Sequence, residues 1–238
     1  MSTTIECPSG LSLVIRGLQA RELKIFQDRA LIKSGLFLDR ILAACVESVT
    51  ESGPYDFEAL PNWDQVLQGD KYFTLLRIRA ESFGDDFSFP VKCSGCDEKY
   101  QWDLKLSDLP LKRLAPADAQ AFKTGTPLVA KIPSSGASIK FRLAVGKDEK
   151  MAAKAKTEQN AILAMLALRI SEIENVEAKD IKGYLETLSL GDFFAMLKEM
   201  GNRDCGVETS IDVACPSCGN EQPVELPIGA GFWNPGRG

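Results

Sequence analysis

Four of the seven cysteines in this chain of 238 residues stand in two pairs that have the spacing of metal ligands. The pairs are Cys93 with Cys96 and Cys215 with Cys218. Two thiols at this spacing can bind one side of a tetrahedral zinc ion, and two pairs complete a closed structural shell of four thiolates. Because the chain contains no histidine, no imidazole can serve as a ligand or as a general acid–base. We therefore predict one structural zinc ion held by the four cysteines.

A redox-active dithiol is the alternative interpretation of either pair. A thioredoxin-type pair stands at the start of a helix, whereas residues that alternate in the manner of strands flank both pairs here. The odd number of cysteines also argues against a disulfide framework. The other three, Cys7, Cys45 and Cys205, are expected to lie outside the metal site. Cys45 falls on the core face of a helix, where a thiol acts as a small apolar group. Cys205 is too far from Cys215 to share its turn, and a place near the metal stays open for it.

The two cysteine pairs belong to a longer pattern that recurs 122 positions later in the chain. Gly69-Asp70 recurs as Gly191-Asp192, and each copy continues through an apolar run, a glycine, the cysteine pair and a leucine. The further matching positions are Gly84 with Gly206, Val91 with Val213, and Leu104 with Leu226. This pattern predicts an internal duplication whose two cysteine turns close on one zinc ion.

Hydrophobic periodicity indicates a mixture of strands and helices along the chain. Strands are expected at 11–16, 87–91, 100–104, 128–132, 137–145, 211–213 and 224–226. Helices are expected at 20–30, 37–49, 70–78, 147–173, 181–188 and 193–200. The fourth of these is long, and its apolar stripe consists of Met151, Ala155, Ile162, Met165, Leu166 and Ile170. Ser34-Gly35 separates the first two helices, and Pro133-Ser-Ser-Gly136 suits a hairpin turn.

These elements predict an α+β fold made of a duplicated strand–helix–helix–knuckle unit. Residues 1–106 would form the first repeat and 128–238 the second, because each ends in a cysteine knuckle. Residues 107–127 carry three prolines and are expected to connect them. One copy alone could not bury its apolar helix faces, whereas two copies packed together could.

Composition excludes several classes of protein. Apolar residues make up 45% and charged residues 26% of the chain, with a net charge of −5, so an ordinary core is expected and a protein that clamps a phosphate backbone is not. No apolar run reaches the roughly 20 residues of a membrane helix. The N-terminus lacks the pattern of a signal peptide, which favours a soluble protein of a reducing cytoplasm.

Nothing in the sequence has the pattern of an active site. Asp70 and Asp192 occupy matching positions and could form an acid–base pair, but acidic residues are common at helix starts. Ser189, three positions before Asp192, has the form of a capping box. No phosphate-binding loop, nucleophile elbow or open metal site is present. We therefore expect no catalysis.

The C-terminal stretch from Gly229 to Gly238 carries an aromatic pair, Phe232 and Trp233, between glycines and prolines. Such a pair either packs onto its own domain or anchors a partner protein. Packing is favoured slightly, since an exposed pair promotes aggregation. Partner binding by Phe232 and Trp233 is kept as a prediction.

Several motifs together give the chain a resemblance to the T-even-type phage baseplate protein family. They are Pro8-Ser9-Gly10, Trp63-x-x-Val66-Leu67-x-Gly69-Asp70, Arg77-x-Arg79, Gly146-Lys-Asp-Glu149, Cys215-Pro-Ser-Cys-Gly219, Leu226-Pro227 and Phe232-Trp233-Asn-Pro235. The resemblance implies a hub or hub-assembly protein of contractile tails that has no known catalysis. It also implies tail partners, including hub and tape-measure proteins, and a place in the host cytoplasm during assembly or in the virion baseplate.

The sequence thus favours a zinc-stabilised, non-enzymatic tail protein. The main alternative is a zinc-ribbon adaptor that binds nucleic acid, since the aromatic residues beside the first knuckle occur in such proteins. Clustering of Lys and Arg on one face would favour the adaptor. A thiol oxidoreductase is a third possibility, which turnover of a disulfide substrate would reveal.

Overall fold

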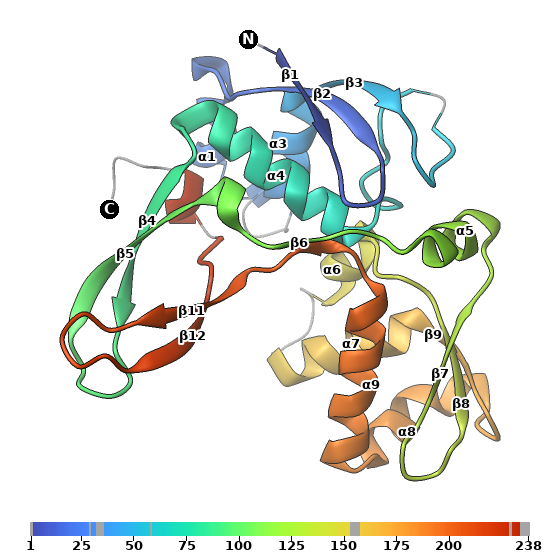
Figure 1. The fold of residues 1–238 in the computed structure, drawn as a ribbon. Helices are drawn as coiled ribbons and strands as arrows, with labels where there is room; N and C mark the ends of the chain where they lie inside the picture. The colour runs from blue at the N-terminus through green and yellow to red at the C-terminus, as the bar shows by residue number, and fades with distance from the viewer. Residues whose placement is uncertain are drawn as a thin grey trace.

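The computed structural model describes residues 2–28, 30–31, 36–57, 59–152, 158–228 and 230–233. It mixes helices with antiparallel sheets, as the predicted α+β class requires (Figure 1). The predicted break at Ser34-Gly35, the stripe position Ala155 and most of the tail beyond Trp233 lie outside the described residues. None of the described helices has both the length and the apolarity needed to cross a bilayer.

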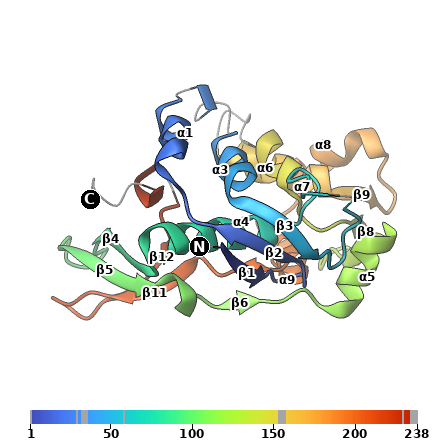
Figure 2. The same ribbon diagram turned by 90° about the horizontal axis from the view of Figure 1, so that it is seen from above.

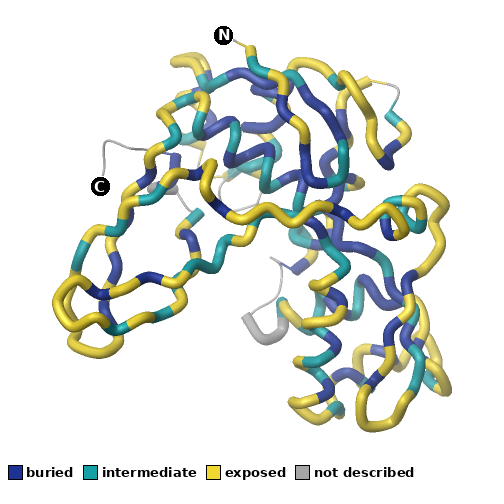
Figure 3. The backbone as a smooth tube through the Cα atoms, in the orientation of Figure 1, coloured by how far each residue is buried: buried dark blue, intermediate teal, exposed yellow. Residues whose placement is uncertain are grey.

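The first part of the chain forms a three-stranded sheet covered by helices. The strands are β1 (Ser2–Glu6), β2 (Ser12–Arg16) and β3 (Val46–Glu51), in the order β1-β2-β3 with antiparallel pairing. The helical elements are η1 (Ala20–Glu22), α1 (Leu23–Gln27), α3 (Phe37–Cys45) and α4 (Gln68–Phe83). Buried side chains of β2, α3 and α4 meet in the core, which the dark tube in Figure 3 follows.

A second sheet of the same order and pairing follows later in the chain. Its strands are β7 (Leu128–Lys131), β8 (Ser138–Phe141) and β9 (Ile170–Ile173), in the order β7-β8-β9. Its helical elements are α6 (Gly146–Ala152), α7 (Glu158–Arg169), η3 (Ala178–Asp180), α8 (Ile181–Thr187) and α9 (Leu190–Arg203). The hairpin predicted around residues 133–136 is confirmed by the β7–β8 pairing.

Two antiparallel ribbons extend from α4 and α9, respectively. The first ribbon consists of β4 (Asp86–Lys92) and β5 (Lys99–Lys105), and the second of β11 (Ser210–Ala214) and β12 (Glu221–Glu225). They lie side by side on one flank of the molecule in both views (Figures 1 and 2). The strands predicted on either side of each cysteine pair are confirmed.

The stretch predicted to connect the repeats contains its own short elements. They are η2 (Leu106–Asp108), β6 (Leu111–Lys112) and α5 (Pro116–Thr124). Strand β6 pairs with β10 (Gly206–Val207), so this stretch also contacts the segment that leads from α9 into the second ribbon. The last described element is η4 (Ala230–Trp233).

Three of the predicted helices are wrong at their ends. The helix expected over 37–49 ends at Cys45, because the β-branched residues that follow pair with β2 as strand β3. The helix expected over 147–173 ends at Arg169, since its last four residues pair with β8 as β9. The helix expected over 20–30 begins as the 3-10 turn η1, its α1 part ends at Gln27, and Leu23 is exposed.

Two further expectations also failed. Of the residues expected in the apolar stripe, Leu166 and Ile170 are buried, but Met151 and Ile162 are exposed. Strand β1 was not expected at all, because its five residues bury only Ile5 and therefore lack the repeated apolar signal of a strand.

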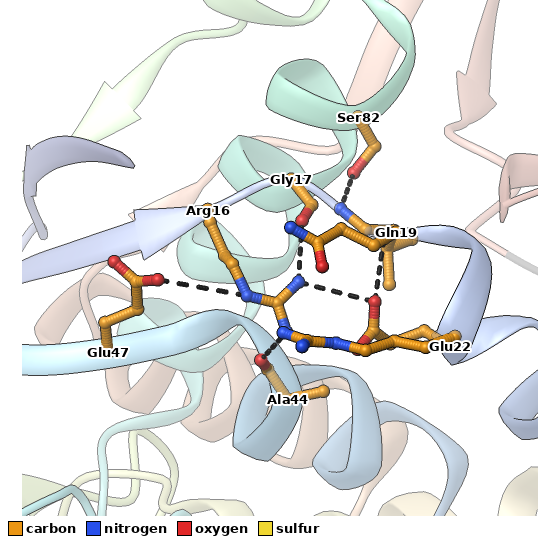
Figure 4. Close-up of polar contacts among 9 residues, drawn as sticks. Arg16, Gly17, Gln19, Glu22, Ala44, Glu47 and Ser82 are labelled. Atoms are coloured by element: carbon orange, nitrogen blue, oxygen red, sulfur yellow. Dashed lines mark hydrogen bonds and ion pairs between the residues drawn. The ribbon is translucent and has the colours of Figure 1, made fainter. Parts of the chain in front are cut away.

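A buried arginine at the end of β2 ties the first sheet to its helices (Figure 4). The Arg16 guanidinium donates to Glu22 and to the carbonyl oxygens of Gly17 and Ala44, and the Glu22 carboxylate also accepts the backbone amide of Gln19. Burial would raise the pKa of Glu22, but the bonds from Arg16 and Gln19 outweigh it and lower that pKa to about 2. The pair therefore stays ionised at neutral pH.

The second sheet carries the same set of contacts 126 positions later, except that the counterpart of Ala44 stands 124 positions later. Arg142 donates to Asp148 and to the carbonyl oxygens of Leu143 and Leu168, while the Asp148 carboxylate accepts the backbone amide of Val145. Each arginine thus joins the end of the second strand of its sheet to the helical turn that follows. It also bonds to the residue that stands two positions before the third strand of that sheet. The two sheets are fixed to their helices by the same chemistry.

We expect Glu22→Gln to cost about 3–5 kcal/mol of unfolding free energy, since it leaves the buried Arg16 charge without its partner. In the wild-type protein the folded-state pKa of Glu22 is depressed, so this contribution is present above pH 4.5 and is lost as the pH falls toward about 2. Urea unfolding at several pH values measures both effects. Glu47→Gln is the control, because Glu47 is partly exposed and 3.9 Å from Arg16, and it should change stability by less than about 1 kcal/mol.

Candidate metal centre

The turns at the tips of the two ribbons bring the four predicted cysteines together. Their Sγ atoms all lie within 4.8 Å of one another, with 3.6 Å between Cys93 and Cys218 and 3.7 Å between Cys96 and Cys215. A tetrahedral ion with metal–sulfur bonds of about 2.3 Å places its sulfur atoms about 3.8 Å apart. The cluster could therefore hold one metal ion, and each ribbon supplies half of it.

The two knuckles have the same backbone geometry. In each, the first cysteine donates its amide to the carbonyl five residues on and accepts an amide from four residues on. The bonds are Cys93 N to Glu98 O (2.9 Å), Asp97 N to Cys93 O (3.1 Å), Cys215 N to Asn220 O (2.9 Å) and Gly219 N to Cys215 O (2.9 Å). Asp97 and Gly219 both have a positive φ, 60° and 71°, a conformation that glycine and aspartate tolerate best.

The electrostatics of the cluster favour a cation. Backbone amides of Cys96 and Gly95 lower the pKa of the Cys93 thiol to about 6. The Glu98 amide lowers the pKa of Cys96, but the neighbouring thiols of Cys218 and Cys93, together with burial, outweigh it and raise that pKa to about 12. Four thiols this close cannot all ionise unless a positive ion offsets their charge.

Side chains of the second ribbon also reach across to the first. Gln222 accepts from the Ser94 amide at 2.6 Å and donates to the Lys92 carbonyl at 2.9 Å. Asn220 donates to the Ser94 hydroxyl at 3.1 Å, and its side chain lies so close to Gly95 that a Cβ atom there would be 3.2 Å away. The ribbons are therefore held together by hydrogen bonds as well as by the cysteine cluster.

Asp70 and Asp192 are both engaged in the same structural contact. Asp70 accepts the Ser9 amide at 3.0 Å and the Ser9 hydroxyl, and Asp192 accepts the Ser134 amide at 3.0 Å and hydroxyl at 2.7 Å. Each carboxylate thereby ties the turn of a β-hairpin to the start of a helix. This geometry favours the structural interpretation over an acid–base pair.

The environments of the two carboxylates nevertheless differ. Asp70 is fully buried and also accepts the Tyr55 hydroxyl, and burial raises its pKa. The bonds from Ser134 and Ser189 lower the pKa of Asp192. Ser189 caps α9 by accepting the Asp192 amide at 3.1 Å, so this half of the predicted capping box is present.

The aromatic pair of the tail lies in the core, as the packed alternative predicts. Phe232 and Trp233 are buried, and Phe232 packs edge-on against Phe87 of the first ribbon with ring centroids 5.0 Å apart. The Arg79 guanidinium lies 5.6 Å from the centre of the Phe232 ring. Two buried donors here, Trp233 Nε1 and Arg79 Nε, have no acceptor within the part of the chain that the structure describes.

Sequence reasoning missed three groups of residues that shape the centre and its support. The Arg16–Glu22 and Arg142–Asp148 pairs share a six-residue spacing that a search for repeats with insertions would find. Asn220 and Gln222 carry no such signal, because an amide side chain on an exposed strand looks like ordinary surface. Of the other cysteines, Cys7, Cys45 and Cys205 lie buried and apart from the described cluster, as expected.

Comparison with known proteins gives one finding about the family. The family model described as T4 bacteriophage base plate protein matches residues 36–228, which include both ribbons and both sheets except β1 and β2. No curated protein and no solved structure gives a significant match.

We expect Gln222→Ala to cost about 1–2 kcal/mol, because two hydrogen bonds between the ribbons are lost. The cost should be larger in metal-free protein, where fewer interactions hold the ribbons together. Thermal unfolding with and without a chelator measures it. The matched control is Gln101→Ala on the exposed face of β5, and an equal effect of the two variants would show that Gln222 does not join the ribbons.

Proposed function

The chain belongs to the T4 bacteriophage base plate protein family, and from this premise we propose that it is a non-enzymatic protein of the tail baseplate hub. Its role would be to form the hub or to assist its assembly by binding other tail proteins. The match to the family over residues 36–228 carries the proposal. The structural engagement of Asp70 and Asp192 supports the absence of catalysis.

The proposal includes one zinc ion bound by Cys93, Cys96, Cys215 and Cys218. The donor set supports zinc, since four thiolates in a closed shell are its usual structural environment. The ion would stabilise the fold and leave no open position for a substrate. It would join chain segments more than a hundred residues apart, so metal binding would contribute directly to folding.

The proposal also includes an internal duplication, with residues 1–106 and 128–238 as the repeats and 107–127 as the connector. Matching contacts at matching positions support it. They are the arginine–carboxylate pairs at 16/22 and 142/148, the serine–aspartate pairs at 9/70 and 134/192, and the two cysteine knuckles. Equal sheet order in both halves is a further support.

The partners we propose are hub and tape-measure proteins, met in the host cytoplasm during assembly or in the virion baseplate. Phe232 and Trp233 would contribute to one such contact. Their burial means that a partner must cover the tail or displace it. Within the described residues Trp233 Nε1 and Arg79 Nε have no acceptor, which would favour a partner that offers carbonyl or carboxylate groups at this place.

The charge of the ribbons disfavours the alternative of a nucleic-acid adaptor. Residues 85–105 and 210–226 hold eight acidic residues and three lysines. Phosphate contacts require the opposite balance. A gel shift with generic DNA at physiological salt should therefore show no binding, and a disulfide-reduction assay should show no turnover.

We expect purified wild-type protein to contain one zinc per chain by elemental analysis. Cys93→Ser and Cys215→Ser should each lose the metal and most of the soluble protein, because a three-thiolate site is open and the ribbons separate. Cys45→Ser is the control, since that thiol is also buried but lies outside the cluster. It should keep its zinc, and less than about half a zinc per wild-type chain would contradict the closed site.

In the phage that encodes this chain, a premature stop codon in its gene should abolish plaque formation. Electron microscopy should then show complete heads but no tails with finished baseplates, and wild-type protein supplied in trans should restore both. Affinity purification from cells late in infection should recover hub and tape-measure proteins. Normal baseplates in the absence of the protein would overturn the proposed role.

A further inference from the structure

The two halves of the chain meet through a contact that uses different surfaces of each. The first turn of α4 in the first half packs against residues 144–149 and 204–207 of the second. Gln68 donates its amide to the Ala144 carbonyl at 2.9 Å, and the Tyr72 hydroxyl donates to Glu149 at 2.7 Å. We call the side that Gln68, Gly69 and Tyr72 supply the helix face, and the opposite side the receiving face.

The closest approach in this contact depends on two glycines. A Cβ atom at Gly69 would lie 1.9 Å from the Cys205 carbonyl oxygen, and a Cβ at Gly206 would lie 3.2 Å from Gly69 Cα. A side chain at position 69 would thus force the halves apart. The contact requires glycine on the helix face.

Each half also has residues that correspond to the face which the other half supplies. These residues take no part in the contact, and we call the two sets the unused faces. Under the proposed duplication, the second-half counterparts of Gln68, Gly69 and Tyr72 are Leu190, Gly191 and Phe194, on the first turns of α9. The first-half counterparts of the receiving residues Ala144, Glu149, Cys205 and Gly206 are Leu18, Leu23, Phe83 and Gly84.

Both unused faces are open and apolar. Leu190 is 73% exposed and Phe194 61%, while Leu23 is 59% exposed and Phe83 40%. A Cβ atom at Gly191 would meet only Ser189 of its own helix, and one at Gly84 would meet nothing within 4 Å. At Gly69 and Gly206, atoms of the other half occupy the space beside the glycine. At Gly191 and Gly84 no described residue of the other half does so.

The residue types on the unused faces complement each other. The polar pair of Tyr72 and Glu149, which closes the contact inside the chain, is replaced at the counterpart positions by Phe194 and Leu23. An apolar side chain on one face would thus meet an apolar side chain on the other. Exposed large apolar residues grouped in this way mark interaction sites.

Figure 1 places the start of α9 and the end of α4, which carry residues of the two unused faces, at different ends of the molecule. Because the two faces differ and lie at different ends, a single contact between two copies uses one face of each kind. A contact between them is head-to-tail, and it leaves one free face of each kind for further copies.

We propose that copies of this chain associate head to tail, with Leu190, Gly191 and Phe194 of one copy seated on Leu23, Phe83 and Gly84 of the next. The contact between copies has the same form as the contact that joins the two halves within one chain. This proposal rests on the duplication proposed above. No second cysteine clasp is available to it, because both knuckles of each copy are already paired. The association is therefore reversible and depends on concentration.

The sharpest test uses two glycines of the same helix. Gly191→Ala adds the methyl group that the contact cannot accommodate, and Gly201→Ala is its control, since a Cβ at Gly201 would meet nothing within 4 Å. Both changes favour a helix, so neither should destabilise the single chain. By light scattering over a range of concentrations, the wild type and Gly201→Ala should exceed the 26.0 kDa of one chain, and Gly191→Ala should stay at that mass.

Mixing two blocked variants tests the direction of the contact. Phe194→Asp removes one face and Leu23→Asp the other, so each alone should stay at 26.0 kDa. In an equimolar mixture, the Leu23→Asp chain still has its face on α9 and the Phe194→Asp chain still has the face that receives it. One copy of each should therefore associate and give a species of twice that mass. Leu60→Asp, at an exposed apolar residue outside both faces, should associate like the wild type.

The proposal is overturned if the wild-type protein stays monomeric up to its solubility limit, if Gly191→Ala associates like Gly201→Ala, or if the mixture stays monomeric. Zinc content measured on the same samples separates this result from the proposed function. A zinc-loaded monomer would contradict the association alone, and a zinc-free oligomer would contradict the metal site alone.

Discussion

Four sulfur atoms within 4.8 Å of one another at the ends of two ribbons are the constraint on which the arrangement of the chain depends. If all four are ionised as thiolates, their charges repel one another. If they are protonated as thiols, they cannot bind a metal ion. A bound divalent cation would resolve this conflict, and its binding energy would then fix the position of one ribbon relative to the other. Since each ribbon continues directly from a long helix, α4 or α9, the constraint extends into both halves of the molecule.

The two halves share their internal chemistry but differ in what surrounds it. Asp70 and Asp192 make the same bonds to a serine of a hairpin turn, yet Asp70 is fully buried. The difference arises because residues 144–149 and 204–207 also pack on the start of α4, whereas Leu190 and Phe194 remain exposed at the start of α9. Similar units in unlike surroundings explain why the pKa of one carboxylate is raised and that of the other is lowered.

The cysteine cluster and the ribbons could be predicted because their signals are local: a fixed spacing of thiols and an alternation of buried and exposed residues. The ends of α3 and α7 could not. Val49 fits the apolar spacing of the preceding helix. It belongs to a strand only because residues 46–51 pair with the free edge of β2. Ile170–Ile173 became a strand for the same reason beside β8. Pairing between distant segments overrides local periodicity at such places.

The distance along the chain between the two knuckles has a consequence for how the protein is made. A ribosome adds about 5–20 residues per second, so roughly 6–25 seconds separate the synthesis of Cys96 from that of Cys218. During that interval the first knuckle is a half-site whose thiols are open to oxidation or to a foreign metal. The Arg16–Glu22 pair and the first sheet lie wholly upstream of it. They are the interactions available to keep the nascent first half folded until the second knuckle emerges.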